Sequence, residues 1–204
     1  MNLRAATFDD VPALRALIEA SARGLSQGWY SAEQIDAAVA YVFGVDTQLI
    51  ADGSYFLIET PEGLAAAGGW SARHTLYGGD QMKESADPRL DPATDPARIR
   101  AFFVDPRWAR RGLARRLYAA CARGAYDAGF RELELMATRP GEPFYLALGF
   151  TVVERVVTTL PGDVEVPFAR MRRRIAPEDV EAALEEPAAV AVRNSRENES
   201  QRNQ

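Results

Sequence analysis

Val104-Asp-Pro-Arg-Trp-Ala-Arg-Arg-Gly-Leu-Ala114 is the stretch that decides the fold, because it joins a predicted strand to a predicted helix. The strand is expected at Ile99 to Val104, and Pro106 prevents it from continuing. The helix is expected from about Arg110 to Asp127. The unpaired amides of a first helical turn and the positive end of the helix dipole together favour a bound anion. The turn is therefore predicted to hold a phosphate or pyrophosphate through its backbone.

The charge of this stretch supports the same interpretation. No acidic residue lies between Asp105 and Asp127. Basic side chains at a helix N-terminus oppose the dipole, so a bound anion explains why they are tolerated there. The alternative is a solvated basic helix face. The arginines are Arg107, Arg110, Arg111, Arg115, Arg116 and Arg123.

The remaining composition excludes several classes of protein. A chain of 204 residues with 47% hydrophobic and 26% charged residues suits one globular domain. One His and one Cys cannot form a Cys/His zinc cage or an intrachain disulfide, so no metal is expected. The N-terminus does not resemble a signal peptide, and no apolar run approaches the roughly 20 residues that span a bilayer. We therefore expect a cytoplasmic protein without a membrane partner.

The order of the other elements predicts a mixed α/β fold. The Ser31-Ala-Glu-Gln34 capping box opens a helix, and a long polar loop from Ala72 to Pro96 interrupts the strands. Loops of that length are usually functional or mobile. The strands are expected at Leu3–Ala6, Tyr55–Glu59, Leu64–Ser71, Ile99–Val104, Glu132–Ala137, Thr151–Thr158 and Val164–Arg173.

The acidity of the chain belongs largely to its C-terminal end. Residues 176–204 hold three arginines and seven acidic residues, and they account for −4 of the net charge of −5. We expect residues 1–175 to form the domain and residues 176–204 to be a disordered acidic tail, in which residues 176–186 could form one frayed helix. A net negative charge over the whole chain would argue against an anionic ligand, but residues 1–175 carry a net charge of only −1 and do not. A nucleic-acid partner is not expected, because the arginines cluster at one helix start.

A second motif follows the first. Phe144-Tyr-Leu-Ala-Leu-Gly-Phe150 forms a short predicted helix after the Glu132–Ala137 strand. Together with Val104-Asp-Pro106 and the small residues Gly112 and Ala114, it resembles the GNAT superfamily of acyl-CoA-dependent N-acetyltransferases. The chain departs from the family pattern in two places. The Arg/Gln position before the glycine falls on Ala109, and the Asn-x-x-Ala pattern falls on Thr138 and Gly141.

The resemblance implies a central, largely antiparallel sheet flanked by helices, which splays apart where acyl-CoA binds. It implies that backbone amides near Phe103 and Val104 hold the pantetheine arm, and that Tyr145 is the general acid toward the CoA thiolate. Tyr145 packing its helix against the sheet is the alternative. Gly112 would be small because the chain passes close to the ligand, so alanine there should be tolerated. The pyrophosphate turn would comprise Arg110, Arg111, Gly112, Leu113, Ala114 and Arg115.

The general base and the acceptor site are less defined by the sequence. Glu134 is the best-placed carboxylate, although it shares a strand face with Glu132 and that face is alternatively the solvated one. His74, at the start of the long loop, is a second candidate, because imidazole has a suitable intrinsic pKa, and a merely exposed loop histidine is its alternative. Asp80 and Asp105 are weaker candidates, and a water chain can replace a side-chain base. Aromatic residues in the loops would line an apolar pocket or surround a cation, unless they belong to the core. The candidate acceptor residues are Trp29, Tyr30, Trp70, His74 and Tyr77.

The expected activity is acetyl transfer from acetyl-CoA to a primary amine of a small molecule or peptide by direct attack. The alternative is a non-catalytic acyl-CoA sensor or interaction protein on the same fold, which would need no general acid. The sequence leaves open the acceptor, the preferred acyl chain and whether the protein forms a homodimer.

Overall fold

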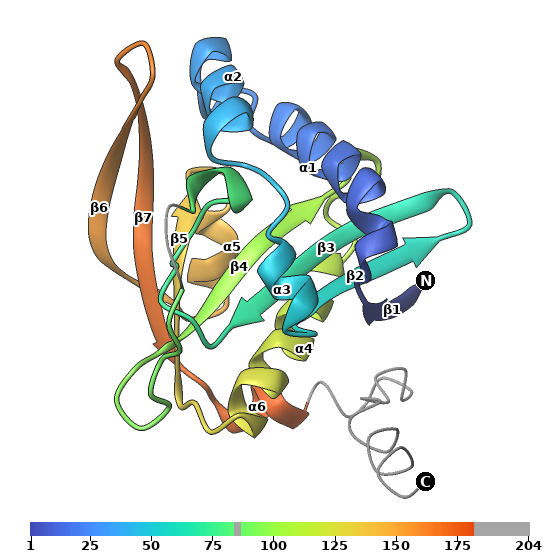
Figure 1. Ribbon diagram of the computed structural model, residues 1–204, viewed down its shortest axis with the longest axis vertical. Helices are drawn as coiled ribbons and strands as arrows, with labels where there is room; N and C mark the ends of the chain where they lie inside the picture. Colours follow the sequence, from blue (N-terminus) through green and yellow to red (C-terminus); the bar gives the residue numbers. More distant parts are fainter. Residues whose placement is uncertain (84–86, 182–204) are drawn as a thin grey trace, which may run out of the picture.

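Seven strands form one sheet in the order β1-β2-β3-β4-β5-β7-β6 (Figure 1). The computed structural model describes residues 1–83 and 87–181. Every neighbouring pair is antiparallel except β4 with β5. The predicted mixed α/β fold with a largely antiparallel sheet is therefore confirmed. The strands are β1 (Asn2–Ala5), β2 (Tyr55–Thr60), β3 (Gly63–Ser71), β4 (Ala97–Val104), β5 (Glu132–Thr138), β6 (Thr151–Leu160) and β7 (Val164–Arg174).

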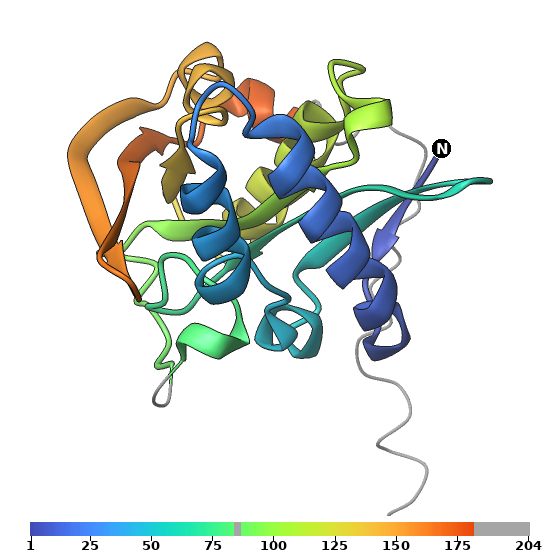
Figure 2. The same cartoon turned by 90° about the horizontal axis from the view of Figure 1, so that it is seen from above.

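Helices cover both faces of the sheet (Figures 1 and 2). Alternate residues of β2 divide between two cores, as the period of a strand requires. Leu57 packs with Leu14 of α1, whereas Phe56 packs with Leu117 of α4. The α-helices are α1 (Val11–Leu25), α2 (Ala32–Tyr41), α3 (Thr47–Ala51), α4 (Leu113–Asp127), α5 (Glu142–Ala147) and α6 (Pro177–Glu181); the 3₁₀ turns are η1 (Phe8–Asp10), η2 (Asp80–Met82) and η3 (Pro106–Trp108).

The sheet opens between its two parallel strands. β4 and β5 pair only at Ala97 with Leu133 and at Arg98 with Glu134, although both strands continue beyond these residues. On its other side β4 carries an irregularity, because its register with β3 shifts between Arg100 and Phe103. Ala101 lies within this irregularity and has a φ of 54°, which is rare for a residue with a Cβ. These two features create a V-shaped gap beside a kinked strand.

The C-terminal part of the described chain returns to the body. β6 and β7 curve away from the rest of the sheet (Figure 2). After β7 the chain forms α6. The carboxylate of Asp179 in this helix is buried and forms an ion pair with the guanidinium of Arg173, with a nitrogen–oxygen distance of 2.8 Å. This short helix extends the folded unit beyond Ile175, and the expectation of disorder for residues 182–204 lies outside the described residues. Within the described chain, no helix is long and apolar enough to cross a membrane.

Candidate active site

A cavity of about 830 Å³ occupies the gap between β4 and β5. Its walls come from α1, β4, the start of α4, β5 and α5, and from two loops on the opposite side. It has two chemically different ends. We call the end beside the N-terminus of α4 the cofactor end, with Arg110, Gly112, Ala114 and Arg115 in its wall. We call the other the acceptor end, and its wall includes Val42, Phe43, Leu76, Tyr77, Arg100, Met136 and Phe168.

Gly112 begins α4 in a left-handed conformation with a φ of 82°. A Cβ added to this residue would meet no atom within 4 Å, so the position requires glycine for its backbone angle. Close passage of the chain to a ligand at Gly112 stays a prediction. The backbone angle is a separate reason for glycine, and because of it alanine should be strained here and not tolerated as expected. The amides of the first turn of α4 have no helical carbonyl one turn before them to bind. The first backbone hydrogen bond of the helix runs from the amide of Arg116 to the carbonyl of Gly112, at 3.1 Å.

Two of the six arginines reach the cofactor end. Arg110 and Arg115 line the cavity, and neither guanidinium has an ion pair with any described residue. Arg111 stacks on Trp108 at 4.7 Å instead, outside the wall. Arg107 pairs with Asp105 at 2.7 Å, and Arg123 pairs with Asp127 at 2.7 Å. The positive charge available to an anion therefore comes from Arg110 and Arg115.

The expected β4 residues also line the cavity. Phe103 and Val104 both contribute to its wall. The amide of Val104 donates a hydrogen bond of 3.0 Å to the hydroxyl of Ser21 on α1, and Ser21 is itself part of the wall. A pantetheine arm that uses the Val104 amide must therefore displace this hydroxyl. Leu113 likewise lines the cavity, although most of its side chain is buried in the core beneath α4.

Tyr145 is placed by α5 in the wall between the two ends. Its ring packs edge-on against Phe102 of β4 and Phe150, with centroid distances of 6.4 and 5.6 Å. Burial raises the pKa of the Tyr145 phenol well above its usual value, so the hydroxyl stays protonated and is available as a hydrogen-bond donor. Thr138 also lines the cavity, and its hydroxyl accepts from the amide of Gly141 at the start of α5.

Glu134 lies outside the cavity wall, in a cluster of arginines. Its buried carboxylate forms an ion pair with Arg98 and a hydrogen bond of 3.0 Å from Arg172, and Arg170 approaches to 3.7 Å. These contacts join β4, β5 and β7. The arrangement counts against Glu134 as the general base, because guanidiniums occupy its carboxylate oxygens and the side chain lies outside the cavity wall. Asp80 and Asp105 also lie outside the wall.

The five predicted acceptor residues divide into two groups. Trp29 and Tyr77 line the cavity, with Trp29 47% exposed at its rim. Tyr30 is buried instead, and its hydroxyl bridges the carbonyl of Pro167 and the amide of Arg139. Trp70 packs edge-on against Phe130 beneath α4, and His74 is exposed outside the wall. The structure therefore places none of these last three residues in the cavity. Tyr30 and Trp70 pack in the core, which was the alternative for the aromatic residues, and His74 is a solvent-exposed loop residue.

Several wall residues were missed by the sequence analysis. Phe43, Leu76 and Phe168 come from segments far apart in the chain, so no local motif joins them. Arg100 had the clearest available signal, since it interrupts the apolar end of β4. Within the described ranges, no Asp, Glu, His, Lys or Cys lines the cavity, and no cluster of metal-ligating side chains exists. We therefore assign no side chain as general base.

The sequence and the fold can now be compared with known proteins. Residues 91–160 match the family described as acetyltransferase (GNAT) domain. No curated protein matches the chain. A GCN5-related N-acetyltransferase from Rhodopseudomonas palustris has a similar fold, with a TM-score of 0.62, 18% identity and coverage of 85% of this chain and 94% of that one.

Two further structures contain the cofactor. The PaiA N-acetyltransferase from Thermoplasma acidophilum, in complex with coenzyme A, gives a TM-score of 0.56 at 13% identity and covers 85% of this chain and 98% of its own. The yncA protein from Salmonella typhimurium, with its cofactor acetyl-CoA, gives 0.56 at 14% identity, with 94% and 98% covered. The match over residues 91–160 contains both sequence motifs, and the fold extends the likeness to the rest of the domain. Residues 91–160 therefore resemble the GNAT acetyltransferase domain family in sequence, and the described chain has the fold of GNAT acetyltransferase structures.

Proposed function

We propose that this protein transfers an acetyl group from acetyl-CoA to a primary amine of a small molecule or peptide. One observation carries the proposal. The cavity between β4 and β5 runs continuously from the unbonded amides at the start of α4, beside Arg110 and Arg115, to the phenol of Tyr145. An anion-binding helix start joined to a proton donor by a single cavity is what a phosphate-bearing acyl donor requires.

The cofactor end would bind the donor mainly through backbone groups. The amides of Leu113, Ala114 and Arg115 would receive the pyrophosphate oxygens, and the guanidiniums of Arg110 and Arg115 would add charge. The pantetheine arm would follow β4 past Phe103 and Val104. The complexes of PaiA with coenzyme A and of yncA with acetyl-CoA, which share the fold, support this placement.

The proposed reaction is direct attack. The neutral amine nitrogen forms a bond to the thioester carbon, the carbon–sulfur bond breaks, and the thiolate leaves. The hydroxyl of Tyr145 would donate a hydrogen bond to the departing sulfur. Because burial raises the pKa of this phenol, the hydroxyl keeps its own proton while it donates a hydrogen bond that stabilises the thiolate. The proton released by the amine would reach the sulfur through water. The products are an N-acetyl amine and coenzyme A.

The experiment that tests this function measures coenzyme A thiol release from acetyl-CoA in the presence of amines. The panel should contain arylalkylamines, amino acids, polyamines, aminoglycosides and peptide N-termini, with mass spectrometry of the acetylated product. We expect product from at least one class of amine. Calorimetric binding of acetyl-CoA without transfer to any amine would instead support the non-catalytic acyl-CoA sensor. Failure to bind acetyl-CoA would contradict both functions.

A further inference from the structure

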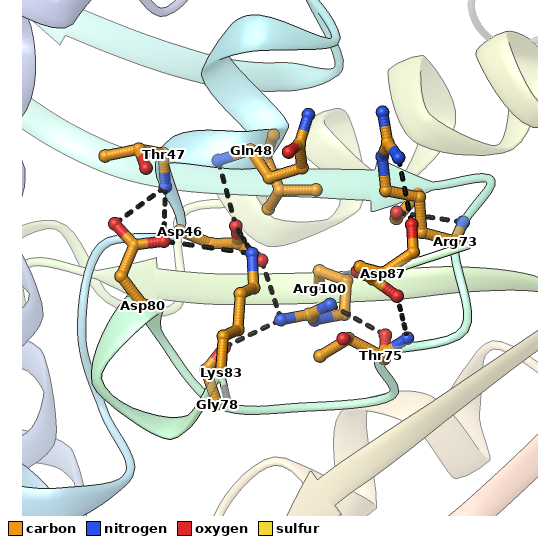
Figure 3. A network of polar contacts seen from close by, with 12 residues as sticks. Asp46, Thr47, Gln48, Arg73, Thr75, Gly78, Asp80, Lys83, Asp87 and Arg100 are labelled. Atoms are coloured by element: carbon orange, nitrogen blue, oxygen red, sulfur yellow. Dashed lines mark hydrogen bonds and ion pairs between the residues drawn. The ribbon is translucent and has the colours of Figure 1, made fainter. Parts of the chain in front are cut away.

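Arg100 occupies an unusual place in the acceptor end. It lies on β4 directly before Ala101, whose positive φ is strained. Its charged side chain is only 2% exposed, in a part of the cavity wall that consists mainly of apolar residues. Burial lowers the pKa of this guanidinium, as expected for a cation withdrawn from water. A buried charge needs several partners, and those of Arg100 come from two different loops (Figure 3).

The first set of partners is in the loop after β3. One terminal nitrogen of Arg100 donates to the carbonyl of Thr75 at 2.7 Å, and the other donates to the carbonyl of Gly78 at 2.7 Å. The two accepting carbonyls therefore enclose Leu76 and Tyr77, which line this side of the acceptor end together with Gly78. One planar guanidinium thus fixes both ends of a two-residue wall segment.

The second partner is Asp46, which begins α3. Its carboxylate is 1% exposed, accepts from Arg100 at 2.8 Å and also pairs with Lys83. The same carboxylate caps α3 by accepting from the amide of Gln48 at 3.1 Å. Asp46 follows Val42 and Phe43, which form the adjoining part of the acceptor end.

Backbone bonds link these two loops to each other. The amide of Gly79 donates to the carbonyl of Val42, and the amide of Asp80 donates to that of Val45, both at 3.0 Å. The position of the 75–80 segment against the 42–46 segment thus depends on one polar network centred on Arg100 and Asp46 (Figure 3). Buried ion pairs add little net stability compared with apolar residues of similar volume, so the network is better explained by the geometry it imposes.

We propose that Arg100 and Asp46 are positioning residues that hold Leu76 and Tyr77 as the wall of the acceptor end, and that they thereby set the affinity for the amine acceptor. This inference rests on the proposed function. The two residues act through the wall segment and are not assigned contact with the reacting atoms. Acetyl-CoA binding, which depends on the start of α4, should be largely independent of them.

The test replaces Arg100 by methionine, which keeps an unbranched apolar stem and removes the three polar bonds. Arg131→Met is the matched control, because Arg131 also donates to two carbonyls, at 3.2 and 2.8 Å, but lies outside the cavity. We expect Arg100→Met to raise the acceptor KM about tenfold, since small misplacements of positioning groups have large kinetic effects. The Kd for acetyl-CoA should stay within about twofold of wild type, and Arg131→Met should change neither constant.

A double-mutant cycle with Leu76→Ala separates positioning from a general loss of structure. If Arg100 acts through the wall, Leu76→Ala should raise the acceptor KM in the wild-type background and add little in the Arg100→Met background. Fully additive effects, or a loss of acetyl-CoA binding equal to the loss of acceptor binding, would overturn the proposal. If Arg100→Met does not fold, Asp46→Asn replaces it in the same cycle, because asparagine keeps the shape and the cap but loses the charge.

Hydrogen exchange provides a readout that needs no acceptor. In Arg100→Met or Asp46→Asn, the amides of Gly79 and Asp80 should exchange faster than in wild type, while the β2–β3 amides are unchanged. Wild-type exchange rates at these two amides would refute the positioning role even if no substrate were known. The proposed function fails separately, when wild-type protein transfers acetyl groups to no amine.

Discussion

The cofactor end and the acceptor end of the cavity are built in opposite ways. The cofactor end comes from one continuous segment, in which the backbone of Gly112 to Arg115 presents the first amides of α4 and two guanidiniums without an ion pair to any described residue reach solvent. The acceptor end comes from α2–α3, the loop after β3, β4, β5 and β7, and its one guanidinium, among the described wall residues, is buried and paired. The cofactor end therefore presents guanidiniums to solvent, where a ligand can reach them, whereas the guanidinium of the acceptor end is bound by protein groups.

This difference teaches where specificity resides. Backbone amides at a helix start bind phosphate whichever side chains surround them, so we expect the cofactor end to tolerate Ala109 in place of Arg or Gln. The acceptor end depends on the shape of an apolar wall, and that shape depends on buried polar contacts between loops. Substitutions should therefore affect donor binding at one end and acceptor binding at the other.

The largest effect is expected at Gly112. Valine in the left-handed conformation adds about 1–2 kcal/mol of strain and misaligns the amides, so Gly112→Val should weaken acetyl-CoA binding on the order of a hundredfold. Gly53→Val is the matched control, because Gly53 also has a positive φ, 68°, and open space around it, but lies outside the cavity. Calorimetry should show normal acetyl-CoA affinity for Gly53→Val. An equal loss of affinity in both variants would show that Gly112 has no specific role in donor binding.

Tyr145→Phe should give the next largest effect. Loss of a hydrogen bond that acts on the leaving group should lower kcat roughly ten- to fiftyfold with an unchanged Kd for acetyl-CoA. Tyr118→Phe provides the control, since Tyr118 is a second buried phenol that lies outside the wall. Steady-state kinetics with an amine found in the panel would measure both. Wild-type kcat in Tyr145→Phe would remove the tyrosine from the mechanism and leave it as a packing residue.

Arg110→Ala and Arg115→Ala should have smaller effects on the cofactor end alone. Exposed charge pairs contribute little, so each variant should weaken acetyl-CoA binding about fivefold, and the difference from wild type should shrink at high salt. Arg123→Ala, on the exposed side of α4, should bind normally. Titrations at low and high ionic strength would decide this, and a change in acceptor KM with unchanged donor binding would contradict the division of the cavity.

The smallest effect is expected from pH. The Tyr145 phenol must be protonated to donate, and its folded-state pKa is raised from an ordinary value of about 10. The phenol is therefore almost fully protonated across neutral and mildly alkaline pH, and its ionisation should not lower kcat between about pH 7 and 10. A fall of kcat in wild type that disappears in Tyr145→Phe would show that the phenol ionises in this range.

The sequence predicted the strand, turn and helix around Gly112 well because the determinants of these elements are local. A strand, a proline, a glycine and a helix follow one another, and the structure places α4 at Leu113–Asp127, close to the expected range. The glycine was predicted for a different reason, since a φ angle is not visible in a motif. The roles of Trp29, Tyr77 and Tyr145 in binding or catalysis stay predictions, although all three line the cavity.

The acceptor end was predicted poorly because its determinants are tertiary. Trp70 and Tyr30 have the same local character as Tyr77, and only packing beneath α4 or against β7 distinguishes them. Glu134 was chosen as a carboxylate on a suitable strand, but its environment depends on arginines of β7 that are far away in sequence. Charge partners across a sheet follow from strand order, which no local pattern specifies.

Hydrogen exchange on adding coenzyme A tests the central claim most directly, because it locates the donor without requiring an acceptor. The account predicts slower exchange at the amides of Leu113, Ala114 and Arg115, with further protection at Phe103 and Val104 and little change at Gly79 and Asp80. Saturating coenzyme A that leaves the first turn of α4 unprotected, while protecting another surface, would contradict it.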